Sequence, residues 1–233
     1  LKSYPGQYDA YFNDHLAFKN PIVAFGKLAD IHVFGEVTSD AVLMGKDGWM
    51  FYKLKGEMED SIADYQGTNH YSVDEMERFG ALLKQAEENL ASRGIKLVFY
   101  MVPNKEQVYS EFMPSSVKVV QEQSKADLLY EYLKENTDCD VYYPLDEFRK
   151  AKDDWCQIYR KYDTHWNDMG AFMASQMVIQ DIDGEPFGPE SYRSYDIENR
   201  GTFSGDLATM LNLQKYYDDD PFLKVSGYRE DVS

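Results

Sequence analysis

The chain has 233 residues, of which 43% are hydrophobic and 28% are charged, a composition typical of a globular protein with one sizeable core. Its 41 acidic and 24 basic residues give a net charge of −17, which argues against nucleic acid and anionic membrane as partners because phosphates are bound by clustered Lys and Arg. No run of residues is long and apolar enough to span a membrane, and we expect a single domain over residues 1–233.

The first 40 residues predict a helical arm in two pieces. Apolar residues recur at helical spacing on both sides of Asn20-Pro21, and the proline is expected to break the helix because it has no N–H to donate. Residues 41–54 predict a β-hairpin, since two short apolar runs flank Lys46-Asp47-Gly48 and Asp-Gly favours a tight turn. Residues 55–71 are expected to form a loop.

The middle of the chain predicts alternating helices and strands. Residues 72–94 predict a helix that begins with a capping box, Ser72 with Glu75, and ends at Gly94. The continuous apolar run 95–103 is typical of a strand buried on both faces of a parallel sheet. A helix over about 115–136, a strand at 139–144 and a short helix at 145–154 follow. This order indicates an α/β fold with a central, mostly parallel sheet.

The last third of the chain predicts less regular structure. Residues 167–181 indicate a helix capped by Asn167 or Asp168. Residues 183–233 are rich in Gly, Pro and Asp, and we expect them to be irregular apart from a short helix at the end of GTFSGDLATML. Cys139 and Cys156 belong to no CxxC motif, and the sequence leaves open whether they form one disulfide or remain two separate thiols.

Two polar loops are candidates for a functional site. In open α/β sheets ligands bind beyond the carboxyl ends of strands. Pro103-Asn104-Lys105 leaves such an end, and the loop 163–167 precedes a helix. If the two loops converge, they mark the site.

The second loop contains Asp163-Thr164-His165-Trp166, for which three interpretations compete. Asp163 can orient His165, which then acts as a base for a serine hydroxyl, as in a catalytic triad. The two residues could also ligate a metal with a third ligand from His15, His32, His70 or a carboxylate, but no metal-like spacing is present and we expect no metal. A polar turn before a helix is the third interpretation, and the four residues alone do not decide between it and catalysis.

Four neighbouring residues are candidates for binding substrate. Asn104 and Lys105 could contribute donors at the site, or serve as a turn former and as a surface charge or ion-pair partner. Trp166 and Tyr162 could form a pocket wall on which a sugar or acyl group stacks, or pack in the core.

Several segments in series resemble a known family. They are FNDHLAFKNPIV (12–23), MGKDGWMFYK (44–53), DYQGTNHYS (64–72), VPNKEQVYSEFMP (102–114), IYRKYDTHWNDMGAF (158–172) and FSGDLATML (203–211). Together they resemble the DHHW family and the SGNH-hydrolase-like acetyltransferase domains of alginate O-acetylation proteins. The resemblance implies a flavodoxin-like SGNH fold and a secreted or membrane-anchored protein of the bacterial cell envelope, from which a signal or anchor has been removed.

The resemblance also implies a chemistry. A Ser–His–Asp triad moves acetyl groups onto polysaccharide hydroxyls, and its Asp and His correspond to Asp163 and His165. The expected partners are a glycan acceptor, an acetyl donor and a membrane-bound acyl-transfer protein, with no cofactor. An acetyl-ester hydrolase and a non-catalytic carbohydrate-binding or scaffolding protein are the alternatives.

The chain departs from the family in one respect. It has no Gly-Asp-Ser or Asp-Ser-Phe segment to supply the nucleophile. The nearest segment, Ser204-Gly205-Asp206-Leu207, resembles an SGDL-like segment that precedes the nucleophile in the family. We therefore expect a chain truncated at its C-terminus that is inactive as it stands.

Overall fold

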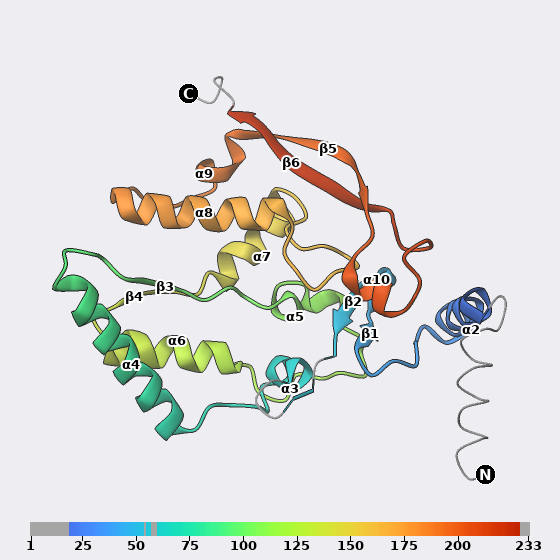
Figure 1. Cartoon of the computed structure of the whole chain (residues 1–233), viewed down its shortest axis with the longest axis horizontal. Coiled ribbons are helices and arrows are strands. Elements are labelled where there is room, and N and C mark those ends of the chain that lie inside the picture. The colour runs from blue at the N-terminus through green and yellow to red at the C-terminus, as the bar shows by residue number, and fades with distance from the viewer. Residues whose placement is uncertain (1–18, 54, 57–59, 229–233) are drawn as a thin grey trace, which may run out of the picture.

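The computed structural model describes residues 19–53, 55–56 and 60–228, and it is layered (Figure 1). Two short parallel strands, β3 (Val98–Tyr100) and β4 (Asp140–Tyr142), lie between helix α8 (Asp168–Asp183) on one side and helices α4 (Val73–Ala91) and α6 (Lys125–Asn136) on the other. This α/β/α arrangement is the predicted fold class.

The parallel pair is shorter than the sequence predicts. Phe99 is opposite Val141, and β3 is half-buried along its three residues rather than buried on both faces over the whole run 95–103. Among the described residues the strands form three separate two-stranded sheets, of which only β3–β4 is parallel.

The two faces of the pair are covered by different contacts. On one face Val141 is buried in a cluster with Leu83 of α4 and Leu133 of α6. On the other face the Tyr100 hydroxyl lies 3.2 Å from Met177 Sδ of α8, and Lys96 forms a salt bridge with Asp181 of the same helix. The strands are therefore held between helices although they are short.

Helix ends follow local capping signals. The predicted capping box of Ser72 and Glu75 is present, and Gly94 has a φ of 72°, the left-handed conformation that ends the turn after α4. The next helix was predicted from about residue 115, but α6 begins at Lys125, because Ser124 and Asp127 form a second capping box there. Helix α7 (Leu145–Asp154) lies where it was expected.

The hairpin is confirmed. Strands β1 (Val42–Met44) and β2 (Met50–Tyr52) pair antiparallel around the short 3₁₀ helix η1 (Lys46–Gly48), in which Asp47 and Gly48 both have positive φ. Trp49 is buried and stacks on Tyr109 with ring centroids 4.3 Å apart.

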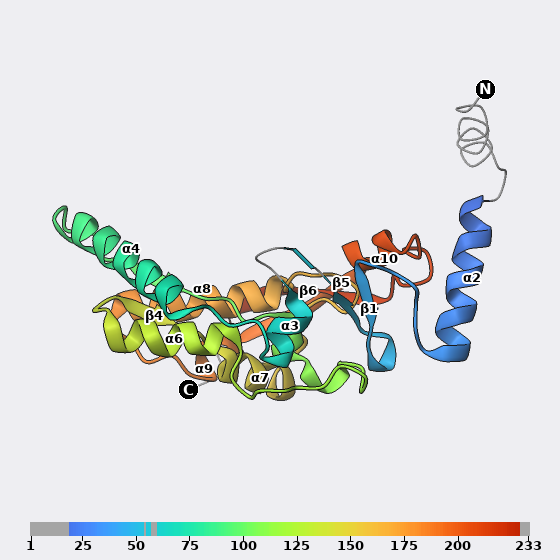
Figure 2. The ribbon, with the colours of Figure 1, turned by 90° about the horizontal axis from the view of Figure 1, so that it is seen from below.

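Two local predictions near the hairpin are wrong. Helix α2 (Lys19–Phe34) is not broken at Asn20-Pro21, because Pro21 lies in the first turn, where its missing N–H is not required. The first predicted helical piece lies outside the described residues. The expected loop 55–71 contains helix α3 (Ser61–Gln66), which the Asp60 side chain caps and Gly67 ends with a φ of 70°. Helix α2 stands at one end of the molecule (Figure 2).

The last third of the chain is more regular than predicted. Strands β5 (Tyr195–Phe203) and β6 (Asp220–Tyr228) form a long antiparallel ribbon beside α8 (Figure 1). The short helix α9 (Glu190–Arg193) precedes the ribbon, and α10 (Asp206–Met210), the predicted short helix, lies between its strands. The ribbon was missed because nine residues such as YDIENRGTF show no clear apolar alternation.

Two apolar clusters meet at the hairpin and position the site. The larger joins Phe51 of β2 to Phe148 of α7 and Met169 of α8, and the smaller joins Met50 of β2 to Tyr162 and to Leu207 of α10. The loop between α7 and α8 is therefore packed between the hairpin and α10. Helix α5 (Lys105–Val108) and the 3₁₀ helix η2 (Ser110–Phe112) follow β3 in the chain.

The structure shows the state of the two cysteines and the length of the helices. Both Cys139 and Cys156 are free thiols, so they form no disulfide with each other, and burial raises the pKa of Cys156 to about 12. Within the described ranges no helix is both long enough and apolar enough to span a bilayer.

Candidate active site

Asp163 and His165 lie in the loop between α7 and α8. The loop is closed at its base, since Tyr159 and Trp166 form an antiparallel bridge and the Asn167 N–H donates to the Ile158 carbonyl over 3.0 Å. Asn167 then caps α8 by accepting from the N–H groups of the helix start. The segment from Asp163 to His165 is a bend.

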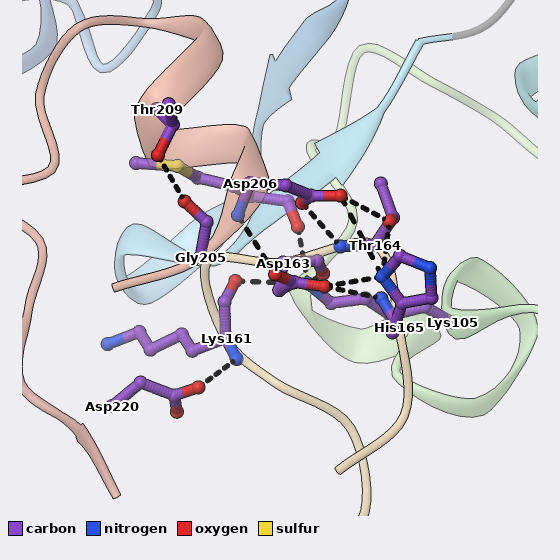
Figure 3. Close-up of polar contacts among 10 residues, drawn as sticks. Lys105, Lys161, Asp163, Thr164, His165, Gly205, Asp206, Thr209 and Asp220 are labelled. Atoms are coloured by element: carbon purple, nitrogen blue, oxygen red, sulfur yellow. Dashed lines mark hydrogen bonds and ion pairs between the residues drawn. The ribbon is translucent and has the colours of Figure 1, made fainter. Parts of the chain in front are cut away.

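The bend brings the carboxylate and the imidazole into direct contact (Figure 3). Asp163 Oδ1 lies 2.8 Å from His165 Nδ1 and also accepts the His165 main-chain N–H over 2.9 Å. Because a carboxylate only accepts, this contact requires that Nδ1 carry the ring proton. The Asp163 side chain is 8% exposed and that of His165 is 74% exposed, so the pair has a buried anchor and an open Nε2.

Hydrogen bonds keep the Asp163 carboxylate ionised. Burial alone would raise its pKa, but bonds from the Asp206 main chain, the His165 main chain and the His165 ring outweigh it, and the pKa lies below its usual value. The second oxygen, Oδ2, accepts the Asp206 N–H over 2.9 Å. Both oxygens of the carboxylate thus accept hydrogen bonds.

Lys105 is buried beneath the loop, 3% exposed. Its ammonium donates to three main-chain carbonyls, those of Met50 at 2.6 Å, Lys161 at 3.0 Å and Asp163 at 3.0 Å. Burial lowers the pKa of Lys105 to about 7, against the nearby carboxylates of Glu106, Asp220, Asp163 and Asp206, which raise it. Three acceptors need three N–H donors, so this geometry fits the ammonium form.

The start of β6 holds the same loop from another side. The Tyr162 hydroxyl donates to Asp219 Oδ1 over 2.6 Å, and Asp220, which is 1% exposed, accepts the Lys161 N–H over 3.0 Å and the Gln157 side-chain amide over 2.6 Å. The backbone on both sides of Asp163 is therefore fixed from α5, β2 and β6.

The two predicted loops do converge, but the four candidate binding residues have different placements. Lys105 is buried and donates to main-chain carbonyls, so it is not a surface charge. Tyr162 is buried in the smaller apolar cluster, so it does not form an exposed pocket wall. Trp166 packs against the larger cluster and stacks on Phe148 at 6.4 Å. Asn104 is exposed at the start of α5, makes no side-chain cap and lines a small hollow of about 200 Å³ with Met101 and Tyr143.

The SGDL segment supplies a residue that the sequence analysis did not assign. Asp206 accepts the Thr164 N–H at Oδ1 over 2.9 Å and the Thr164 hydroxyl at Oδ2 over 2.6 Å. Ser204, in contrast, has its Oγ buried with no hydrogen-bond partner. The resemblance of residues 204–207 to the SGDL-like segment of the family pointed to this position. A resemblance in sequence does not, however, reveal which residues the segment contacts.

Asp163, His165 and Asp206 could in principle share a metal ion, since their potential ligand atoms lie within 4.8 Å of one another. The carboxylate oxygens, however, already face the N–H groups of Thr164, His165 and Asp206 and the Thr164 hydroxyl. These donors place positive charge where a cation would sit. The geometry therefore suits a protonated imidazole nitrogen better than a divalent ion.

The layered fold and the Asp–His pair define the chain as an SGNH-hydrolase-like α/β domain. Residues 42–222 match the family described as SGNH hydrolase-like domain, acetyltransferase AlgX, and the chain belongs to this family. The family that the sequence segments resemble is thereby confirmed.

Relatives and solved structures agree with this assignment. The chain is 26% identical over 221 residues to a probable alginate O-acetylase AlgJ of Pseudomonas syringae pv. tomato, covering 90% of this chain and 51% of that protein. It is 26% identical over 189 residues to the corresponding protein of Pseudomonas aeruginosa, covering 76% of this chain and 43% of that protein. The chain thus spans about half the length of the curated relatives it matches.

The structural matches concern the fold. The O-acetyltransferase domain of Pseudomonas putida AlgJ matches with a TM-score of 0.50 and 19% identity, covering 82% of this chain and 66% of that one. A DHHW family protein from Eubacterium siraeum matches with a TM-score of 0.51 and 17% identity, covering 81% of this chain and 55% of that one.

Replacing Lys105 by Met should destabilise the protein. The variant removes the ammonium from three buried carbonyls, of which, among the described residues, only that of Lys161 keeps another donor, the Met50 N–H at 3.1 Å. Relief of the ammonium's burial offsets only part of this loss, so we expect a net decrease of about 2 kcal/mol in the free energy of unfolding. Urea denaturation followed by circular dichroism measures it. Lys84→Met, an exposed lysine on α4, is the matched control and should change little. Equal stability of the two variants would contradict the anchoring role of Lys105.

Asp163 should make stability depend on pH in the acid range. Its pKa in the folded protein is lower than in the unfolded chain, so the unfolded chain binds more protons between the two values and stability falls as pH drops through them. In Asp163→Asn this contribution is absent. We expect the free energy of unfolding of the wild type to fall more steeply than that of the variant from about pH 5 to about pH 3. Parallel pH profiles from urea denaturation would contradict the assignment.

Proposed function

We propose that the complete gene product is a polysaccharide O-acetyltransferase of the cell envelope, with Asp163 and His165 as two members of its catalytic triad. The observation that carries the proposal is the 2.8 Å contact between the buried Asp163 carboxylate and Nδ1 of an exposed histidine. It is supported by membership of a family described as acetyltransferase and by relatives named alginate O-acetylases.

The geometry supports a double displacement. Nε2 of His165 takes the proton of a serine hydroxyl as its oxygen attacks the acetyl carbonyl, and the departing donor group then takes that proton. A sugar hydroxyl next attacks the acetyl-enzyme, gives its proton to Nε2, and the serine oxygen recovers it. Asp163 keeps the other ring nitrogen protonated and offsets the positive charge that forms on the ring. The nucleophile is a serine other than Ser204, whose Oγ is enclosed.

The proposed substrates and location are supported by the same family. We propose an extracytoplasmic protein that takes acetyl groups from a donor, delivered by a membrane-bound acyl-transfer protein, and passes them to a glycan. The 74% exposure of the His165 side chain is compatible with an acceptor as large as a polysaccharide, which cannot enter a closed pocket.

Hydrolysis of acetyl esters is the second candidate, and the same exposure favours it. Water reaches an open Nε2 as readily as a sugar hydroxyl does, and it would release acetate from the acetyl-enzyme. The two reactions share every step up to that point, so the identity of the acceptor separates them.

His165→Ala should abolish acetyl transfer in the full-length gene product. Loss of the base lowers kcat by about a thousandfold or more, and Asp163→Asn should do nearly the same because the ring proton is no longer held on Nδ1. Release of acetyl from a chromogenic acetyl ester, with and without a glycan acceptor, measures it. His32→Ala, an exposed histidine of α2, is the control and should keep full activity. A His165→Ala protein as active as the control would refute the triad.

The charge of the chain bears on the acceptor. Alginate carries one carboxylate per sugar, whereas this chain has a net charge of −17. At the site the ammonium of Lys105 is buried, while the Asp206 carboxylate, 33% exposed, lies beside His165. An anionic polymer would therefore be repelled both at long range and at the reacting centre. We propose a neutral or amine-bearing glycan as the preferred acceptor.

This preference should depend on salt. In the full-length gene product the KM for a polyuronate acceptor should fall by about threefold or more between roughly 20 mM and 500 mM salt, because screening removes the repulsion, while the KM for a neutral glucan stays constant. Acetylation of the two oligosaccharides measures it. A polyuronate KM that rises with salt would show that the acceptor is attracted by charge and would overturn the assignment.

A further inference from the structure

Asp206 contacts every residue of the Asp163-Thr164-His165 bend (Figure 3). Its main-chain N–H donates to Asp163 Oδ2 over 2.9 Å. Its carboxylate accepts the main-chain N–H of Thr164 over 2.9 Å and the Thr164 hydroxyl over 2.6 Å, and Oδ2 lies 3.8 Å from His165 Nδ1. Asp206 therefore binds the Asp163 carboxylate and Thr164, and it places a negative charge near the His165 ring.

Gly205 makes this approach possible. A Cβ atom at this position would lie 2.0 Å from the Tyr162 carbonyl oxygen, a main-chain atom that cannot move aside, so no other residue fits. The Leu207 N–H donates to the same oxygen over 3.1 Å, which fixes the start of α10 against the loop. Backbone contacts of both of its neighbours thus hold Asp206 against the loop.

Two features of this arrangement act on the proton of the His165 ring. The Thr164 Oγ1 lies 3.0 Å from Nδ1, and because it gives its hydrogen to Asp206 it presents a lone pair to the ring. The Asp206 carboxylate adds a second negative charge on the Nδ1 side, beyond that of Asp163. Both features favour a hydrogen on Nδ1 and leave Nε2 without one.

We propose that Asp206 is a positioning residue of the Asp163–His165 pair, which acts through Thr164 and through its own charge to keep the ring proton on Nδ1. The role of a bare Nε2 as a base rests on the proposed function. The tautomer itself does not, since it is a property of the folded chain without nucleophile, donor or acceptor.

Nitrogen-15 NMR of the histidine rings tests the proposal in this chain. At a pH of about 8, where an ordinary imidazole is neutral, wild-type His165 should show a protonated Nδ1 and an unprotonated Nε2. In Asp206→Asn the ratio of the Nδ1–H to the Nε2–H tautomer should fall by about threefold or more, because a charge within 4 Å of the ring is removed. Asp163→Asn gives the largest fall and serves as the reference. His165→Ala identifies the signals among four histidines.

Matched variants separate charge from fold. Asp138→Asn removes an exposed carboxylate elsewhere and should leave the ratio unchanged. Asp206→Ser keeps a short hydrogen-bonding oxygen without the charge and is a second variant should Asp206→Asn fail to fold, as judged by circular dichroism. A wild-type ratio in either folded Asp206 variant would overturn the proposal.

Kinetics in the full-length gene product link the tautomer to turnover. Asp206→Asn should lower kcat for ester cleavage by about tenfold or more and change KM by less than about twofold, since the residue acts through His165. An unchanged kcat in a variant whose tautomer ratio has fallen would overturn the catalytic part of the proposal. If His165→Ala itself keeps activity, the proposed function fails, while the tautomer result still supports the positioning of the ring by Asp206.

Discussion

The site depends on one buried ammonium, that of Lys105. It binds the carbonyls of Met50, Lys161 and Asp163, which come from a strand and a loop more than 100 residues apart. An ammonium donates in three fixed directions, so these carbonyls must converge on it. With the Asp163 carbonyl directed inward, the carboxylate of the same residue is left to face α10 and the His165 ring. A buried charge thereby determines how the Asp163–His165 pair is oriented.

The side chain of Asp163 is buried and that of His165 is exposed, and this difference suits the proposed chemistry. The Asp163 carboxylate is enclosed and receives hydrogen bonds on both oxygens, which holds it ionised in one orientation. The imidazole extends into solvent from this anchor. A rigid acceptor beneath an accessible base allows a large polymer to bring its hydroxyl to Nε2 while the proton on the opposite nitrogen stays in place.

The sequence predicted features whose signal lies within a few residues. The capping box at Ser72, the Asp47-Gly48 turn, the Asn167 cap and the contact of Asp163 with His165 all depend on neighbours at most three residues apart. Features that depend on distant contacts were missed or misjudged. Lys105 has no sequence mark of burial, and the polar strand β5 is stabilised by pairing with β6 about 25 residues later. The sequence left Tyr162 open between a pocket wall and the core, because nothing nearby reveals the bond to Asp219.

The family segments act together because they meet at one site. GKDGWM, PNK, DTHWN and SGDL are separated by up to about 160 residues, yet each supplies a contact of the same site. The hairpin brings the Met50 carbonyl, PNK brings the ammonium, DTHWN brings the pair, and SGDL brings a glycine that permits close approach and an aspartate that receives the bend. Loss of the Lys105 or the Asp206 side chain removes hydrogen bonds from groups that belong to the other segments. The four motifs therefore form one three-dimensional unit. Within SGDL it is Asp206 that contacts the bend, whereas the Ser204 hydroxyl is buried and makes no hydrogen bond within the described part of the chain.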